Sequence, residues 1–251
     1  MSGHPEVHLS PGGDVVGTYR KGAPTINEIE EGRTPGTDLP VWETEFGRIG
    51  SLICWDSRYP ELGIKYAQKD LDLLLFPTHD SGGSRAPFRI WPKRYGFHVA
   101  AVSTDFGQVY GPTGIEGETT DGWGSTAVEF DTGGRAPVSF AEVNTDYEAF
   151  ATGQNRDVFP TIREEYGGSL AFHEQPDAGV VVVESIDDSV SIAEIEGEYG
   201  VESLYETDEL ERMFDYEDRT RAHIRDTVED SPVLPSGFAS SMPRVAPTSD
   251  D

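Results

Sequence analysis

The chain has one cysteine, few lysines and no long apolar segment. A single cysteine, Cys54, excludes an intrachain disulfide and a zinc site built from several cysteines. The longest apolar runs, such as 71–76 and 180–183, are too short to span a bilayer. The six histidines are scattered and lack the spacing of a metal site. We therefore expect a protein without a metal, a cofactor or a membrane span.

Positive charge is scarce as well. The 251 residues include 46 acidic side chains against 19 lysines and arginines, which gives a net charge of -27. The only lysines are Lys21, Lys65, Lys69 and Lys93. Acids spread over the whole chain suit a protein that works in concentrated salt, because ions screen the self-repulsion of the folded state. No basic stripe is available to neutralise phosphate, so nucleic acid is not an expected partner.

The composition and the first residues together predict where the protein works. Residues 1–5, Met-Ser-Gly-His-Pro, do not have the pattern of a signal peptide. With no apolar span elsewhere, we expect a halophilic, soluble protein of the cytoplasm. The alternative is an acidic protein that does not depend on salt.

The cysteine lies where a strand pattern changes into a helix pattern. Residues 47–53 are largely apolar, and Pro60 at the start of 60–70 is typical of the first turn of a helix. This places the thiol of Cys54 on a sharp bend, where helix-start N–H groups favour negative charge. The thiolate is the nucleophilic form of cysteine, so the setting indicates a catalytic residue. The alternative is a small, buried apolar side chain.

Two sequence blocks resemble the nitrilase superfamily of carbon–nitrogen hydrolases. The first is Tyr-Arg-Lys at 19–21 with Pro-Thr-Ile-Asn-Glu at 24–28. The second contains Gly-Arg-Ile-Gly at 47–50, Ile-Cys-Trp-Asp at 53–56 and Arg-Tyr-Pro-Glu at 58–61. Weaker similarity extends through a Leu-Leu-Leu-Phe-Pro strand and a Gly-Trp-Gly-Ser strand with its hairpin, so that the resemblance covers about residues 7–145.

The resemblance implies a reaction and a set of site residues. Cys54 would be the nucleophile, and Lys21 would be the catalytic lysine, which stabilises the developing negative charge together with the backbone N–H of Trp55. Glu28 would be the family's second glutamate, which orients the lysine or positions water. The implied reaction converts a nitrile or an amide to an acid and ammonia through a cysteine thioester. Trp55 and His79 are expected to line the substrate pocket.

These assignments have plainer alternatives. Glu28 could be one more solvated acid in an acid-rich chain, His79 a solvated loop histidine, and Trp55 a packing residue. The substrate also stays open between nitrile and amide. Trp55 and the 24–28 block are similar to the nitrilase branch, whereas 56–61 is similar to the amidase branches.

One member of the family's catalytic set has no counterpart in the expected place. Family members carry a catalytic glutamate on an early strand, well before the Tyr-Arg-Lys block. Glu6 lies too close to Lys21 for the helix and strands that normally separate the two, and 6–19 reads better as a hairpin with a turn at 11–14. We therefore expect the N-terminal segment of the family to be absent. The alternative function is a catalytically inactive nitrilase-like scaffold or fragment.

Alternating strand and helix patterns predict a layered α/β fold. Strands are expected at 71–77, 98–104, 125–131 and 136–144, with helices at 60–70 and near 91–97. The glycine-rich stretch 105–124 is expected to be a loop over the site. The resemblance implies a four-layer α-β-β-α sandwich of the nitrilase type, N-terminally incomplete, that forms a homo-oligomer through its helical face.

The second half of the chain resembles the family less. Residues 146–178 look irregular and polar, 179–183 form a short buried strand, and 192–205 and 206–225 are expected to be acidic amphipathic helices. The last residues are rich in proline, serine and aspartate, which is typical of disorder. We expect a carbon–nitrogen hydrolase-like domain over 1–226 and a disordered acidic tail over 227–251.

Overall fold

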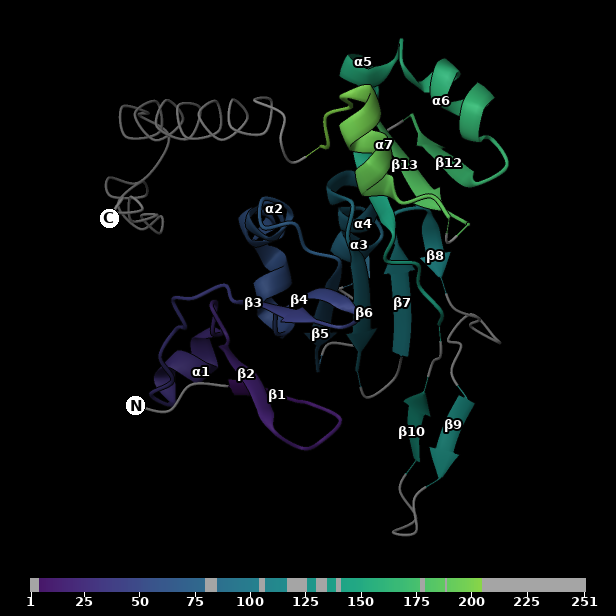
Figure 1. The fold of residues 1–251 in the computed structure, drawn as a ribbon. Coiled ribbons are helices and arrows are strands. Elements are labelled where there is room, and N and C mark those ends of the chain that lie inside the picture. Colours follow the sequence, from purple (N-terminus) through teal and green to yellow (C-terminus); the bar gives the residue numbers. More distant parts are fainter. Residues whose placement is uncertain are drawn as a thin grey trace, which may run out of the picture. The chain divides into compact units, whose positions relative to one another are not determined.

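The structure is a computed structural model that describes residues 5–79, 85–103, 107–116, 126–129, 135–138, 141–176, 179–187 and 189–204. Its largest sheet has six strands in the order β3-β4-β5-β6-β7-β8 (Figure 1). These are β3 (Val41–Thr44), β4 (Gly47–Ser51), β5 (Leu73–Pro77), β6 (His98–Val102), β7 (Gly107–Gly111) and β8 (Gly114–Glu116). The central strands β4, β5 and β6 are parallel, and β3, β7 and β8 each run antiparallel to the strand they join: β4, β6 and β7.

Helices fill the connections between the parallel strands. They are the 3-10 turn η1 (Cys54–Arg58), α2 (Pro60–Ala67), α3 (Arg85–Phe88) and α4 (Trp91–Tyr95). Helix α2 is fixed over β4 because the buried Tyr66 hydroxyl accepts the N–H of Ser51 and donates to its carbonyl. The core beneath α3 and α4 is aromatic, with the rings of Phe76 and Phe88 4.2 Å apart.

A separate two-stranded hairpin precedes this sheet in the chain. Strands β1 (Pro5–Leu9) and β2 (Val15–Arg20) pair antiparallel, and the short helix α1 (Ile26–Glu30) follows. The inner face of the hairpin packs on β3, where the ring of His8 lies 4.2 Å from that of Trp42. Gly17 permits this approach, because a Cβ at that position would fall 1.9 Å from the indole nitrogen of Trp42. The predicted hairpin is confirmed.

Residues 141–204 contribute a three-stranded antiparallel sheet in the order β11-β13-β12. Its strands are β11 (Tyr147–Ala151), β12 (Leu170–Gln175) and β13 (Val180–Ser185), and its helices are α5 (Thr152–Asn155), α6 (Phe159–Tyr166) and α7 (Ile192–Tyr199). An apolar core that includes Phe150, Phe159 and Ile195 holds α6 and α7 on this sheet. The Tyr147 hydroxyl donates to the carbonyl of Asp72, which ties β11 to the larger sheet. A last pair, β9 (Thr126–Glu129) and β10 (Arg135–Val138), forms a two-stranded antiparallel sheet.

Most of the predicted elements are confirmed, including the α/β class, helix α2, and strands β5, β6, β9 and β13. The strand expected at 136–144 is confirmed only in its first part, as β10, because residues 141–144 are not in a strand. Two predictions about irregular segments are wrong. The expected loop 105–124 contains the antiparallel strands β7 and β8, and the expected irregular stretch 146–178 contains two strands and two helices. The first error arose because the glycine-rich sequence favoured a loop, although β7 forms hairpins with its neighbours β6 and β8. The second arose in part because β11 pairs with β13, which is distant in the chain, and such pairing overrides a weak local pattern.

Other boundaries differ in detail or stay untested. The helix expected over 192–205 ends at Tyr199, because Gly200 takes the left-handed conformation with φ of 61°. Residues 206–225 and the expected tail lie outside the described residues. The four-layer layering and the domain boundary at 226 stay predictions. Within the described ranges, no helix has the length and apolarity needed to cross a bilayer.

Candidate active site

The cysteine occupies a strained bend at the carboxyl end of β4. Cys54 is the first residue of η1 and has a positive φ of 50°, a conformation that non-glycine residues rarely adopt. Its side chain is partly exposed. The hydroxyl of Ser57 donates to the Cys54 carbonyl at 3.0 Å and closes the turn. A nucleophile on a sharp strand-to-helix turn is presented clear of the backbone, and such strain is typical of functional positions.

Lys21 follows β2 directly, and its side chain is only 3% exposed. Its ammonium donates to both carboxylate oxygens of Glu28, at 2.8 and 3.0 Å. Glu28 also accepts the N–H of Thr25 and thereby completes the capping box of α1. Burial disfavours ionised Glu28, but the bonds from Lys21 and Thr25 outweigh that cost and lower the pKa of Glu28 to about 2. The structure thus brings together these two predicted site residues.

A third acid, Asp56, joins the lysine segment to the cysteine segment. Its fully buried carboxylate accepts the Tyr19 hydroxyl at 2.9 Å, the N–H of Ala23 at 2.6 Å and the N–H of Ile53 at 2.8 Å. Burial raises the pKa of Asp56, and the three donated bonds act against that shift. Asp56 was not among the site residues predicted from the sequence. Its position two residues after the cysteine, in the first turn of a helix, was the available signal.

Glu6 lies closer to the bend than its place in the sequence suggested. It pairs in register with Tyr19 on the hairpin, and its carboxyl group interacts with Ser51, the last residue of β4. The imidazole of His8 lies 3.7 Å from one carboxylate oxygen, and among the described residues the other oxygen is buried without a hydrogen-bond partner. Burial raises the pKa of Glu6 to about 7, and the bond with Ser51 only partly offsets that effect.

The two residues expected to bind substrate, Trp55 and His79, both lie beyond the carboxyl ends of parallel strands of the larger sheet. Trp55 follows the cysteine directly, is 41% exposed, and carries the Arg58 guanidinium 5.1 Å above its ring. His79 is exposed and lies just past the end of β5. Because β4 and β5 run parallel, the residues after both strands leave the sheet on the same side. The roles of Trp55 and His79 stay predictions.

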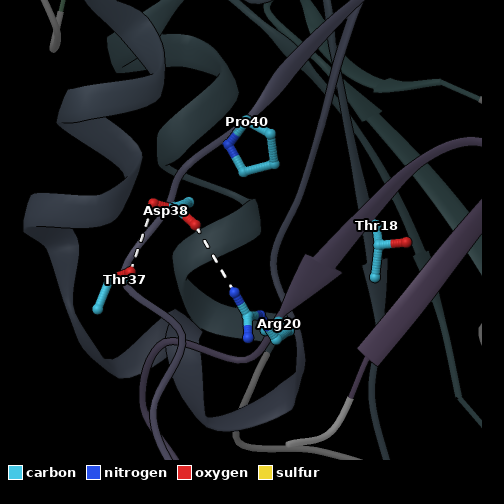
Figure 2. A pocket seen from close by; sticks show the side chains of 5 residues that line it. All are labelled: Thr18, Arg20, Thr37, Asp38 and Pro40. Atoms are coloured by element: carbon cyan, nitrogen blue, oxygen red, sulfur yellow. Dashed lines mark hydrogen bonds and ion pairs between the residues drawn. The ribbon is translucent and has the colours of Figure 1, made fainter.

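A shallow pocket of about 280 Å³ lies on the other face of β2 (Figure 2). It is lined by Thr18, Arg20, Thr37, Asp38 and Pro40. Thr18 and Arg20 alternate along the strand with Tyr19 and Lys21, so they point away from the buried cluster. The Arg20–Asp38 pair is long, at 4.0 Å, and both side chains are well exposed, so it contributes little. This pocket is therefore separate from the cysteine bend.

A strained cysteine shortly after a strand, on a bend that a buried acid bonds to the segment of a buried lysine, is an arrangement that suits an enzyme with a thiol nucleophile. Within the described part of the chain, no group of three metal-ligating side chains could hold a metal ion. The family model for carbon-nitrogen hydrolases matches residues 6–133, just over half of the chain. The chain belongs to the carbon–nitrogen hydrolase family.

Curated relatives match a limited part of the chain. A probable nitrilase of Schizosaccharomyces pombe is 33% identical over 73 residues, which are 29% of this chain and 26% of the relative. A bifunctional nitrilase/nitrile hydratase of Oryza sativa subsp. japonica is 38% identical over 74 residues, which are 29% and 20% of the two chains. The matched segment thus spans about a quarter or less of these relatives.

Among solved structures, Saccharomyces cerevisiae Nit3, a member of branch 10 of the nitrilase superfamily, is similar with a TM-score of 0.43 and 17% identity. The similarity covers 65% of this chain and 57% of Nit3. An amidase from Nesterenkonia sp. is similar with a TM-score of 0.40 and 23% identity, over 44% of this chain and 48% of the amidase.

Proposed function

We propose that the chain hydrolyses non-peptide carbon–nitrogen bonds and converts a nitrile or an amide to an acid and ammonia. The observation that supports this most directly is the pairing of two features inside the family match. Cys54 stands at a positive-φ bend, and the buried Lys21 is ion-paired with Glu28 on the segment bonded to that bend through Asp56. The restricted length of the relatives' match leaves the substrate class as part of the proposal.

The proposed chemistry proceeds through a thioester. The sulfur of Cys54 attacks the carbonyl or nitrile carbon, and negative charge develops on the oxygen or nitrogen. The Lys21 ammonium and the backbone N–H of Trp55 stabilise that charge, while Glu28 orients the ammonium. With an amide, the C–N bond of the tetrahedral species breaks, and the nitrogen takes up the thiol proton and departs as ammonia. With a nitrile, the first product is a thioimidate, which adds one water at carbon before its nitrogen departs as ammonia. Both routes leave the thioester. Water then attacks the thioester carbon, which releases the acid and restores the thiol.

The setting of the reaction belongs to the same proposal. We expect a homo-oligomer of the cytoplasm that works in concentrated salt, with Trp55 and His79 beside the substrate. The net charge of -27 supports the salt requirement, because unscreened repulsion would oppose the compact state. No cofactor or metal is needed for the steps described.

The test is an ammonia assay on the purified chain in molar potassium chloride with short nitriles and amides. We expect release by the wild type, none above background from Cys54→Ala, and strong loss in Lys21→Met. Trp55→Ala and His79→Ala are expected mainly to raise KM. Asp38→Asn, in the separate pocket on β2, serves as a matched control that keeps its activity. Release that persists in Cys54→Ala would overturn the proposed nucleophile.

A second candidate is a catalytically inactive scaffold of the same family. The observation that favours it is the position of Glu6, whose carboxyl group faces Ser51 and His8 on a hairpin immediately before Lys21. The resemblance places the family's catalytic glutamate on an earlier strand, so the proton acceptor has no assigned residue. A folded wild type that releases no ammonia from any nitrile or amide would favour the scaffold.

A further inference from the structure

The carboxylate of Asp56 is the point where two chain segments meet. On the lysine side, Oδ1 accepts the N–H of Ala23 and Oδ2 accepts the Tyr19 hydroxyl. On the cysteine side, Oδ2 accepts the N–H of Ile53, the residue before Cys54. The same Tyr19 hydroxyl accepts the N–H of Gly22, so the residues on both sides of Lys21 are held.

The hydrogen bonds to Asp56 are strong because its carboxylate is buried. Asp56 is fully buried, so water does not compete for its oxygens, and bonds to a carboxylate in such a site are stronger than neutral ones. The two bonds from backbone N–H groups fix main chain, not flexible side chain. The Lys21 charge also acts on the Asp56 carboxyl, which places the ammonium within electrostatic range of the bend. Few degrees of freedom therefore remain between the two segments.

We propose that Asp56 is a positioning residue that holds the ammonium of Lys21 near the sulfur of Cys54. Asp56 does not touch the reacting atoms in this assignment, and it acts through the turn after β2 and through the bend. The consequence for turnover depends on the proposed hydrolase function. The consequence for the thiol does not, because a nearby cation favours the thiolate whether or not a substrate is turned over.

The proposal predicts that removing the Asp56 charge slows alkylation of Cys54. A purely electrostatic role of Asp56 predicts the opposite change. Removing a negative charge near a thiol would by itself favour the thiolate and speed its alkylation. Loosening the Lys21 turn would instead withdraw the cation and slow alkylation. An amide side chain provides this change, because Asn has one acceptor oxygen. In either orientation, its amino group would face a backbone N–H, of Ala23 or of Ile53, and break that bond.

The experiment follows alkylation of Cys54 by iodoacetamide in the full chain in molar potassium chloride, from pH 6 to 10. Cys54 is the only cysteine, so the mass increase reports this thiol alone. We expect Asp56→Asn to slow alkylation at pH 7.5 by about ten-fold, which corresponds to a shift of the pH profile by about one unit. In a Lys21→Met background, Asp56→Asn should cause no further slowing, because the cation is already absent.

Asp72→Asn is the matched control. Asp72 is a half-buried carboxyl that also accepts a backbone N–H, from Arg48 in β4 at 2.7 Å, and this bond joins neither the turn around Lys21 nor the bend at Cys54. The rate of Cys54 alkylation in Asp72→Asn should stay within about two-fold of the wild-type rate. Equal slowing in Asp72→Asn and Asp56→Asn would overturn the proposal, and so would unchanged or faster alkylation in folded Asp56→Asn.

Tyr19→Phe decides the matter if Asp56→Asn does not fold. It removes the hydroxyl that bonds Asp56 and Gly22 while leaving the carboxylate in place. We expect slowing of about three-fold in the same direction, and an unchanged rate would contradict the proposal. The two proposals can fail separately. If the wild type releases no ammonia but Asp56→Asn still slows alkylation of Cys54, the proposed function is rejected and the positioning role stands. If the wild type releases ammonia but Asp56→Asn leaves the alkylation rate unchanged, the positioning role is rejected and the proposed function stands.

Discussion

The ammonium of Lys21 and the carboxylate of Glu28 are joined by two hydrogen bonds, of 2.8 and 3.0 Å. The same carboxylate caps helix α1, so the helix start and the buried cation depend on one side chain. A buried ammonium is costly without an anionic partner, because it has given up its hydration. This pair thus explains how an acid-rich chain keeps a cation in its interior, on the segment that Asp56 bonds to the cysteine bend.

Replacing Glu28 by Gln should destabilise the protein by roughly 2–4 kcal/mol. The change leaves the ammonium of Lys21, which is 3% exposed, without its anion. Removing the cation as well, in Lys21→Met with Glu28→Gln, should recover much of that loss. Urea unfolding in constant salt measures both. Glu30→Gln, on an exposed position of the same helix, is the control, and an equal loss there would contradict the prediction.

The contribution of the Lys21–Glu28 pair to the free energy of unfolding should decrease in acid. The folded-state pKa of Glu28 is about 2, below the usual 4.5, so its stabilisation is complete above about pH 4.5. It is lost as the pH falls through that range towards 2. The difference in unfolding free energy between wild type and Glu28→Gln should therefore shrink over this interval. A difference that stays constant from pH 5 to pH 2.5 would show that the carboxylate is not held ionised.

Glu6 should give the opposite pH dependence. Burial raises the pKa of Glu6 from 4.5 to about 7, so the folded state holds a proton that the unfolded chain releases. Stability from protonated Glu6 is present below about pH 4.5 and is lost as the pH rises towards 7. Glu6→Gln cannot ionise, so relative to wild type it should gain on the order of 2 kcal/mol between pH 5 and pH 8. Parallel stability curves for the two proteins would be the contrary result.

The docking of the hairpin should be sensitive to a single methyl group. In Gly17→Ala the new Cβ would overlap the Trp42 indole, with only 1.9 Å to its nitrogen, so β2 would have to lift from β3. We expect a loss of about 1–3 kcal/mol in denaturant unfolding. Gly12→Ala is the matched change in the same hairpin, since the nearest atom there lies at an ordinary 3.5 Å. Similar losses in both variants would contradict the packing described.

Salt dependence tests the interpretation of the charge. With a net charge of -27, the folded chain should gain stability as potassium chloride rises from 0.2 to 3 M, with the midpoint of thermal unfolding increasing by about 10 °C. Sucrose of equal osmolality does not screen charge and should give a smaller increase. An equal response to both solutes would indicate general exclusion of solute and not relief of repulsion.

Local patterns were sufficient where the signal lies within a few residues. The hairpin of β1 and β2, the Pro60 start of α2 and the strand before Cys54 follow from alternation, turn residues and proline placement. They were insufficient where a distant partner strand decides, as for β11, which pairs with β13. Strand β7 pairs with the neighbouring β6, but glycines at both of its ends favoured a loop interpretation. In the site, Lys21, Glu28 and Cys54 were found from two motifs, whereas Asp56 and Glu6 acquired their surroundings only by packing.

The order of residues alone determined the family and the net negative charge, because motifs and charge do not depend on long-range contacts. It also led to the proposal of Cys54 as the nucleophile. The tertiary structure decided which acids are ionised and what they hold. Burial and the number of donors are properties of packing, and they leave Glu28 charged against Lys21 but favour a protonated Glu6 beside Ser51. They also made Asp56, one aspartate among many in the sequence, the bond between the lysine turn and the cysteine bend.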